Sequence, residues 1–147
     1  MLFRSQAAGE RARPLPSSLV LAAEIRTRAG DPAGALARLD EADRLARAMR
    51  LDAVPGLEYQ RADALARLGR APEAEAAYRR EIARFPRHLQ AWANLGVLLH
   101  LQRRPAELDR LMGEMAAANP GPAARDVAAK TFDALGDRKR AAAWRKK

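Results

Sequence analysis

The feature that most constrains the fold of this chain is an internal repeat marked by its turn residues. Gly30, Gly69, Arg103 and Gly136 follow one another at intervals of 39, 34 and 33 residues. Each lies between two segments whose apolar residues recur at helical spacing. Glycine commonly ends helices because it adopts the left-handed backbone conformation without strain. A unit of about 34 residues that repeats in this way predicts a row of stacked helix pairs.

The composition predicts helices throughout the chain. Hydrophobic residues make up 48% of the 147 residues but aromatic residues only 5%, so alanine and leucine supply most of the apolar surface. Both are strong helix formers. We expect residues 1–15 to form a mobile basic lead-in and residues 16–147 to form one all-α domain. The predicted helices cover residues 17–29, 32–49, 55–68, 72–84, 88–101, 105–118, 122–135 and 138–146.

The repeated unit resembles the tetratricopeptide repeat (TPR) family. Trp92, Leu95 and Gly96, followed by a helix-ending Pro120, match the family signature in type and spacing, and Pro86 lies 34 residues before Pro120. The resemblance implies a right-handed superhelical solenoid of about four antiparallel helix-turn-helix repeats, with the last repeat as a cap. The repeats cover residues 17–50, 55–88, 89–121 and 122–147.

Three features depart from the repeat pattern. Arg103 replaces a turn glycine, so the turn needs either an arginine at positive φ or another geometry. Leu108 replaces a small residue, which predicts slightly wider packing of its helix pair. The first interval is about five residues too long, which indicates an insertion near residues 51–54 or a longer preceding helix.

Side chains suited to catalysis or metal binding are scarce. The chain has no cysteine, and its two histidines, His88 and His100, are twelve residues apart and outside any familiar zinc-binding motif. Serine and threonine are few, and no glycine-rich loop suited to phosphate is present. We therefore expect no enzymatic activity, no cofactor and no metal site. Ser17 and Ser18 are instead expected to cap the first helix.

The net charge of +9 comes mainly from the two ends of the chain. The last ten residues alone contribute +6 and residues 16–137 only +1, so the charge does not favour nucleic acid as a partner. No run approaches the roughly 18 apolar residues of a membrane span. With no signal-peptide pattern and no cysteine, the sequence predicts a cytoplasmic protein.

In TPR proteins, the first helices of successive repeats line a concave groove that holds peptides or partner segments. The resemblance implies that the second and third repeats supply the main groove residues. Val20, Glu24 and Arg28 extend the groove in the first repeat. Asp126, Lys130 and Asp133 extend it in the last repeat. The main groove residues are Tyr59, Gln60, Asp63, Arg67, Ala93, Asn94, Val97, His100 and Leu101.

Asn94 matches an asparagine with which the family holds a peptide backbone, since an amide donates and accepts at once. The plainer interpretation is an ordinary surface amide. Chaperone-binding members surround this asparagine with lysine and arginine. Tyr59, Asp63, Ala123 and Val127 occupy those positions here, which disfavours an acidic C-terminal tail as the ligand.

Two functional hypotheses follow from the sequence. The first is a non-catalytic protein–protein interaction scaffold that binds a peptide or partner segment in the groove. The alternative is that the chain is a fragment, namely the C-terminal helical tail of a larger sulfatase-like or glycosyltransferase-like enzyme. In that case, the groove docks onto the missing catalytic domain. The identity of the partner, the oligomeric state and the role of the basic C-terminus are left open.

Overall fold

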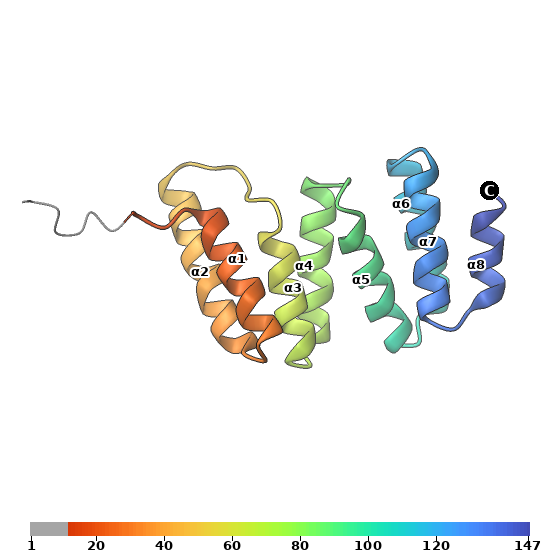
Figure 1. Cartoon of the computed structure of the whole chain (residues 1–147), viewed down its shortest axis with the longest axis horizontal. Helices are drawn as coiled ribbons and strands as arrows, with labels where there is room; N and C mark the ends of the chain where they lie inside the picture. The colour runs from red at the N-terminus through yellow and green to blue at the C-terminus, as the bar shows by residue number, and fades with distance from the viewer. Residues whose placement is uncertain (1–11) are drawn as a thin grey trace, which may run out of the picture.

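The computed structural model describes residues 12–147, which form eight helices in four antiparallel pairs (Figure 1). Each predicted boundary lies within two residues of the observed one, and no described residue is in a strand. The all-α repeat solenoid is therefore confirmed. Residues 1–11 of the expected lead-in lie outside the described residues. The helices are α1 (Pro16–Arg28), α2 (Pro32–Ala48), α3 (Leu57–Arg67), α4 (Ala71–Arg84), α5 (Leu89–Leu101), α6 (Pro105–Ala118), α7 (Pro122–Ala134) and α8 (Arg138–Arg145).

The four helix pairs close with the same turn. Gly30, Gly69 and Gly136 have φ values of 85°, 74° and 80°, and Arg103 adopts the same left-handed conformation at 57°. After each of them, the next amide donates to a carbonyl five residues earlier, as from Arg104 to Leu99 at 3.0 Å. Arg103 thus keeps the glycine geometry, the first of the two alternatives that the sequence left open.

The helices after two of these turns start at a capping aspartate. The side chain of Asp31 accepts a hydrogen bond of 2.8 Å from the Gly34 amide at the start of α2. Asp137 likewise accepts from the Arg140 amide at 3.0 Å at the start of α8. The expectation that Ser17 and Ser18 cap α1 was wrong. Neither serine is the N-cap, because the helix already starts at Pro16 and Leu15 precedes it. Ser18 still contributes from inside the first turn, since its hydroxyl accepts from the Leu15 amide at 3.1 Å and donates to the Leu15 carbonyl.

The long first interval has two sources. α2 has 17 residues, whereas α4 and α6 have 14 each. A second left-handed arginine, Arg50, ends α2 at a φ of 56° and opens an irregular connector to Gly56. A longer helix and an insertion therefore occur together.

Apolar packing forms one large core and one small one. The large core runs from α3 to α8 and is built around Trp92, Leu95, Met112 and Phe132. Gly96 is needed there because a β-carbon on it would lie 2.7 Å from the Met112 methyl group and 3.0 Å from a methyl carbon of Leu108. The absence of a side chain at Gly96 on α5 thus leaves the space that Leu108 and Met112 of α6 fill.

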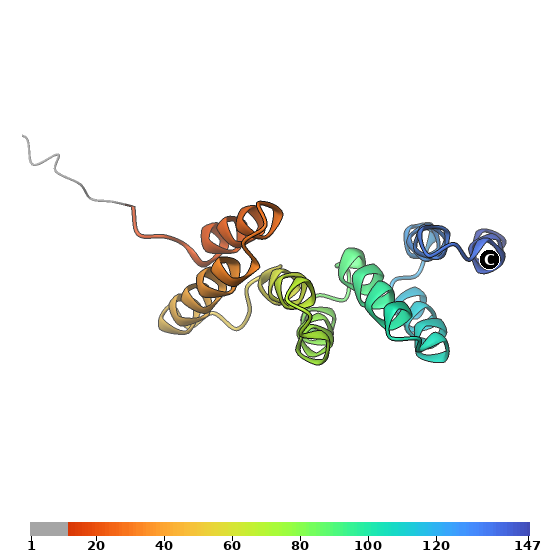
Figure 2. The ribbon, with the colours of Figure 1, turned by 90° about the horizontal axis from the view of Figure 1, so that it is seen from below.

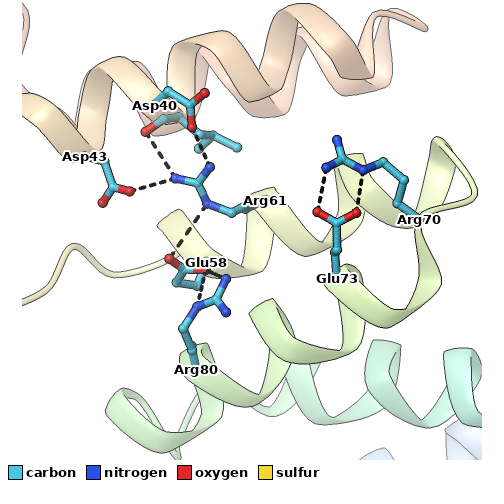
Figure 3. A network of polar contacts seen from close by, with 8 residues as sticks. Asp40, Asp43, Glu58, Arg61, Arg70, Glu73 and Arg80 are labelled. Carbon is cyan, nitrogen blue, oxygen red and sulfur yellow. Dashed lines mark hydrogen bonds and ion pairs between the residues drawn. The ribbon is translucent and has the colours of Figure 1, made fainter.

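The small core holds the first helix pair together. Ion pairs connect this helix pair to the second repeat. Arg61 on α3 donates to Asp40 at 2.7 Å and to Asp43 at 3.0 Å, both on α2 (Figure 3). Its side chain is only 14% exposed. Glu58, beside it on α3, pairs with Arg80 of α4 at 2.8 Å. This chain of ion pairs ties three successive helices together.

The first helices of the pairs follow one another along one side of the solenoid. α1, α3, α5 and α7 lie on that side, and α2, α4 and α6 lie on the other (Figure 2). Side chains that face outward from the first helices can therefore form one continuous surface across the repeats.

Candidate functional site

The candidate site is the outward face of the first helices, called here the first-helix surface. Its members come from α1, α3 and α5 and are exposed or partly exposed. They include most of the residues that the sequence assigned to a groove. The first-helix surface consists of Glu24, Arg28, Tyr59, Asp63, Arg67, Gln90, Asn94, Val97, His100 and Leu101.

Hydrogen bonds between side chains connect α3 to α5 at the centre of this surface. The Asn94 amide donates to the Tyr59 hydroxyl at 3.0 Å, across 35 residues of sequence. Gln90 donates to the Asn94 carbonyl oxygen at 2.8 Å. Asn94 is therefore more than an ordinary surface amide, because it joins two repeats. The hydroxyl proton of Tyr59 still remains for a ligand.

The Tyr59 ring packs near two other rings. Its centroid is 4.6 Å from that of His88 and 6.0 Å from that of Tyr78. Burial raises the pKa of Tyr59, and the negative charge of Asp63 raises it further. The hydroxyl therefore stays protonated at neutral pH and can donate a hydrogen bond. Packing against both rings fixes it, so its orientation is set before any partner arrives.

A buried carboxylate supports this arrangement from below. Glu81 of α4 is 1% exposed and accepts hydrogen bonds from the backbone amides of Gly56 at 2.9 Å and Tyr59 at 3.3 Å. The Nδ1 atom of His88 lies 2.8 Å from the same carboxylate. Free amides at a helix start attract negative charge. Glu81 thus holds the start of α3, and with it Tyr59, in place.

Sequence reasoning missed Glu81, although a signal was present. When the repeats are aligned on their turn residues, Glu81 occupies the position of Ala42 and Met115. Both of those residues are fully buried, at 0% exposure. A carboxylate at a core position needs hydrogen-bond donors from outside its own helix. Such a carboxylate in the sequence therefore indicates that a neighbouring helix start, here that of α3, supplies them.

Charge is distributed unevenly over the first-helix surface. Glu24 pairs with Arg28 at 2.7 Å, and Asp63 pairs with Arg67 at 3.2 Å, each one turn apart. At the equivalent positions of α5 the chain has Val97 and Leu101 instead, and Leu101 is 72% exposed. The α1 and α3 parts of the surface therefore carry ion pairs at these positions, and the equivalent positions of α5 are apolar.

Three predicted groove residues do not reach this surface. Gln60 is 8% exposed, Ala93 8% and Val20 9%, so all three pack between helices. Asp126 and Lys130 are exposed on α7 and form an ion pair at 2.7 Å. The structure thus brings Tyr59, Asn94 and the two ion pairs of α1 and α3 together and removes Gln60 from the candidate set.

An apolar cavity lies on the other side of the solenoid. It has a volume of about 500 Å³ and is formed by the C-terminal half of α2, the connector to α3, and α4, with Leu51, Val54 and Phe85 in its apolar wall. Among residues 12–147, no three His, Asp or Glu side chains are placed to share a metal ion. No helix in this range is long and apolar enough to cross a membrane.

Comparison with known proteins supports the repeat assignment. A family model described as Tetratricopeptide repeat matches residues 55–98. No curated protein sequence matches the chain. A crystal structure of MamA has a TM-score of 0.64 at 17% identity, and the match covers 89% of this chain and 74% of that one. A MamA RS-1 ArsTM double mutant has a TM-score of 0.59 at 23% identity, with 88% and 70% covered.

At these identities, the likeness to MamA concerns the fold alone. The family model covers the α3–α4 pair and most of α5, and the same left-handed turn recurs on both sides of it. Residues 55–98 match the tetratricopeptide repeat family, and the described chain as a whole has the fold of a helical repeat solenoid.

Proposed function

We propose that the protein is a non-catalytic scaffold that binds a peptide or partner segment on its first-helix surface. The observation that carries the proposal is the hydrogen bond from Asn94 to Tyr59. It places the Tyr59 hydroxyl and the Asn94 amide side by side on a partly exposed surface, and the hydroxyl still has its proton to donate. A peptide backbone presents carbonyl acceptors that such a pair can bind.

The charge distribution indicates the kind of segment that fits. The apolar pair Val97 and Leu101 on α5 suits an aliphatic or aromatic anchor residue. The ion pairs of Glu24 and Asp63 lie towards α1 and suit polar residues of either sign, since each pair offers both charges. We expect a bound segment with an apolar residue at one end and polar residues at the other.

The alternative expected from the sequence, a helical tail of a larger enzyme, uses the same surface. The bound segment then belongs to the catalytic domain of the same polypeptide rather than to another protein. The residues that recognise the segment are the same in both cases, so the variants that test one also test the other.

The experiment selects ligands from a displayed library of random peptides on the immobilised full chain. The affinity of the selected peptides is then measured by isothermal titration calorimetry. Tyr59→Ala and Asn94→Ala are each expected to weaken binding about tenfold or more, as interface anchors do. Tyr59→Phe keeps the ring packing and removes only the hydroxyl, so its loss of affinity reports the hydrogen bond.

The control is Arg44→Ala, which truncates an exposed arginine on α2 at the other side of the solenoid. It is expected to leave the affinity unchanged. Selected peptides that bind Tyr59→Phe and Asn94→Ala as tightly as the unmodified chain would contradict the proposal. Circular dichroism of each variant shows that a loss of affinity does not come from unfolding.

A further inference from the structure

The turn between α5 and α6 carries an exposed arginine, Arg103, that pairs with no carboxylate of residues 12–147. The arginines at the equivalent turn between α3 and α4 are both neutralised. Arg67 pairs with Asp63 at 3.2 Å, and Arg70 pairs with Glu73 across the turn. The third repeat therefore differs from the second in the charge that it leaves available at its turn.

Alignment of the two turns shows that Arg103 is an additional charge. Arg104 occupies the position of Arg70, and it pairs with Glu107 as Arg70 pairs with Glu73. Arg103 instead stands where the other turns have glycine, and it keeps their left-handed conformation with a φ of 57°. The α5–α6 turn thus has one positive charge more than the α3–α4 turn, and its surroundings do not balance that charge.

Arg103 lines an open pocket that extends the first-helix surface to the edge of the solenoid. The pocket has a volume of about 530 Å³ and is lined by His100, Leu101, Arg103, Arg104 and Pro105, none of which is acidic. His100 and Leu101 also belong to the first-helix surface. Leu101 is 72% exposed, more than any other large apolar side chain among residues 12–147. The pocket therefore combines exposed hydrocarbon with an unpaired guanidinium group.

We infer that this pocket receives an acidic side chain of the bound segment, next to the apolar residue that contacts Leu101. The inference rests on the proposed function and adds the chemistry of one end of the same segment. A guanidinium group donates two parallel hydrogen bonds to a carboxylate, and Leu101 lies in the same pocket as Arg103. The partner segment is therefore expected to carry aspartate or glutamate beside an aliphatic or aromatic residue.

Arg103→Gly tests this inference, because it removes the guanidinium group without disturbing the turn. Glycine adopts the left-handed conformation without steric cost, as Gly30, Gly69 and Gly136 do at the other turns. A lower affinity of this variant therefore cannot be attributed to unfolding, and its melting temperature should not fall.

The ligands are the peptides selected from the displayed library, synthesised with an amidated C-terminus so that any carboxylate belongs to a side chain. These peptides should share an acidic residue beside an apolar one. By isothermal titration calorimetry, Arg103→Gly should bind them about fivefold more weakly, the upper end of what an exposed ion pair contributes. Replacing the acidic residue of the peptide by its amide should weaken binding to the unmodified chain equally and to Arg103→Gly not at all.

Arg50→Gly is the matched control. Arg50 is the other non-glycine residue of 12–147 with a positive φ, at 56°, and it is also exposed. It lies in the connector between α2 and α3, which runs along one edge of the solenoid, whereas the α5–α6 turn lies along the opposite edge (Figure 1). The control removes the same charge from the same backbone conformation, so it should leave the affinity unchanged.

Three results would overturn the inference. The first is equal affinity of Arg103→Gly and the unmodified chain for the selected peptides. The second is a set of selected peptides without a shared acidic residue. The third is equal weakening by Arg103→Gly and Arg50→Gly, which would indicate attraction to the net charge rather than contact in the pocket. Binding that survives Tyr59→Phe and Asn94→Ala contradicts the proposed function, whereas binding that survives Arg103→Gly alone contradicts only this inference.

Discussion

The second and third repeats share the same left-handed turn but are stabilised by different interactions. Aligned on their turns, Arg61 and Glu81 of the second repeat occupy the positions of Leu95 and Met115 in the third. Leu95 and Met115 are fully buried in the large core. Glu81 is equally buried but bonds to two backbone amides, whereas Arg61 pairs with carboxylates of α2. Equivalent positions can therefore hold charge or hydrocarbon, provided that their neighbours differ accordingly.

The same contrast continues onto the surface. The ion pair of Asp63 and Arg67 in the second repeat is replaced by Val97 and Leu101 in the third. The second repeat thus has charged side chains on the first-helix surface where the third has aliphatic ones, and the hydrogen bond between Tyr59 and Asn94 joins the two. Under the proposed function, a ligand that spans both repeats contacts both kinds of side chain.

The largest effect is expected when the polar chemistry of the second repeat is moved into the third. In Met115→Glu, a carboxylate enters a site with 0% exposure whose neighbours are apolar. We expect a loss of about 4 kcal/mol or more in the free energy of unfolding, because the carboxylate lacks donors. Urea denaturation followed by circular dichroism measures it. Met115→Leu conserves volume and should cost about 1 kcal/mol; a similar loss in both variants would show that shape, not charge, decides.

The reverse exchange should have a smaller effect. In Glu81→Met, the amides of Gly56 and Tyr59 and the ring of His88 lose their acceptor. We expect a loss of about 3 kcal/mol in the free energy of unfolding, since hydrogen bonds to a charged group are strong. Hydrogen exchange should show the start of α3 opening first. Glu81→Gln keeps an acceptor and should lose less; no difference between the two variants would mean that Glu81 does not hold α3.

Local sequence signals predicted most of the fold. Gly30, Gly69 and Gly136 mark turns because a positive φ favours glycine at each position, and the apolar spacing shows which face of each helix is buried. The repeat spacing also predicted a turn at Arg103 and left only the backbone conformation of that turn open. These features depend on residues close together in sequence, so a single chain reveals them.

The parts that the sequence did not predict depend on contacts between repeats. Gln60 was predicted to lie on the surface, but it is buried. The pattern of a single helix does not show which of its residues a neighbouring first helix covers. Arg61 is satisfied by Asp40 and Asp43, 18 or more residues away. Tyr59 and Asn94 were chosen separately as groove residues, and their direct hydrogen bond became visible only in the structure.

The smallest effect concerns the turns that end α3 and α5. Gly69 and Arg103 make the same turn, at φ values of 74° and 57°, but only glycine does so without steric cost. Arg103→Gly should therefore raise the free energy of unfolding by about 1 kcal/mol, since the left-handed conformation costs other residues roughly that much. Gly69→Arg should lower it by a similar amount, and thermal melting of both variants measures the difference. Because a β-carbon at Gly69 has no atom within 4 Å, clashes cannot explain the loss. If Arg103→Gly instead lowers the stability, the arginine side chain contributes a contact that outweighs the strain in its backbone.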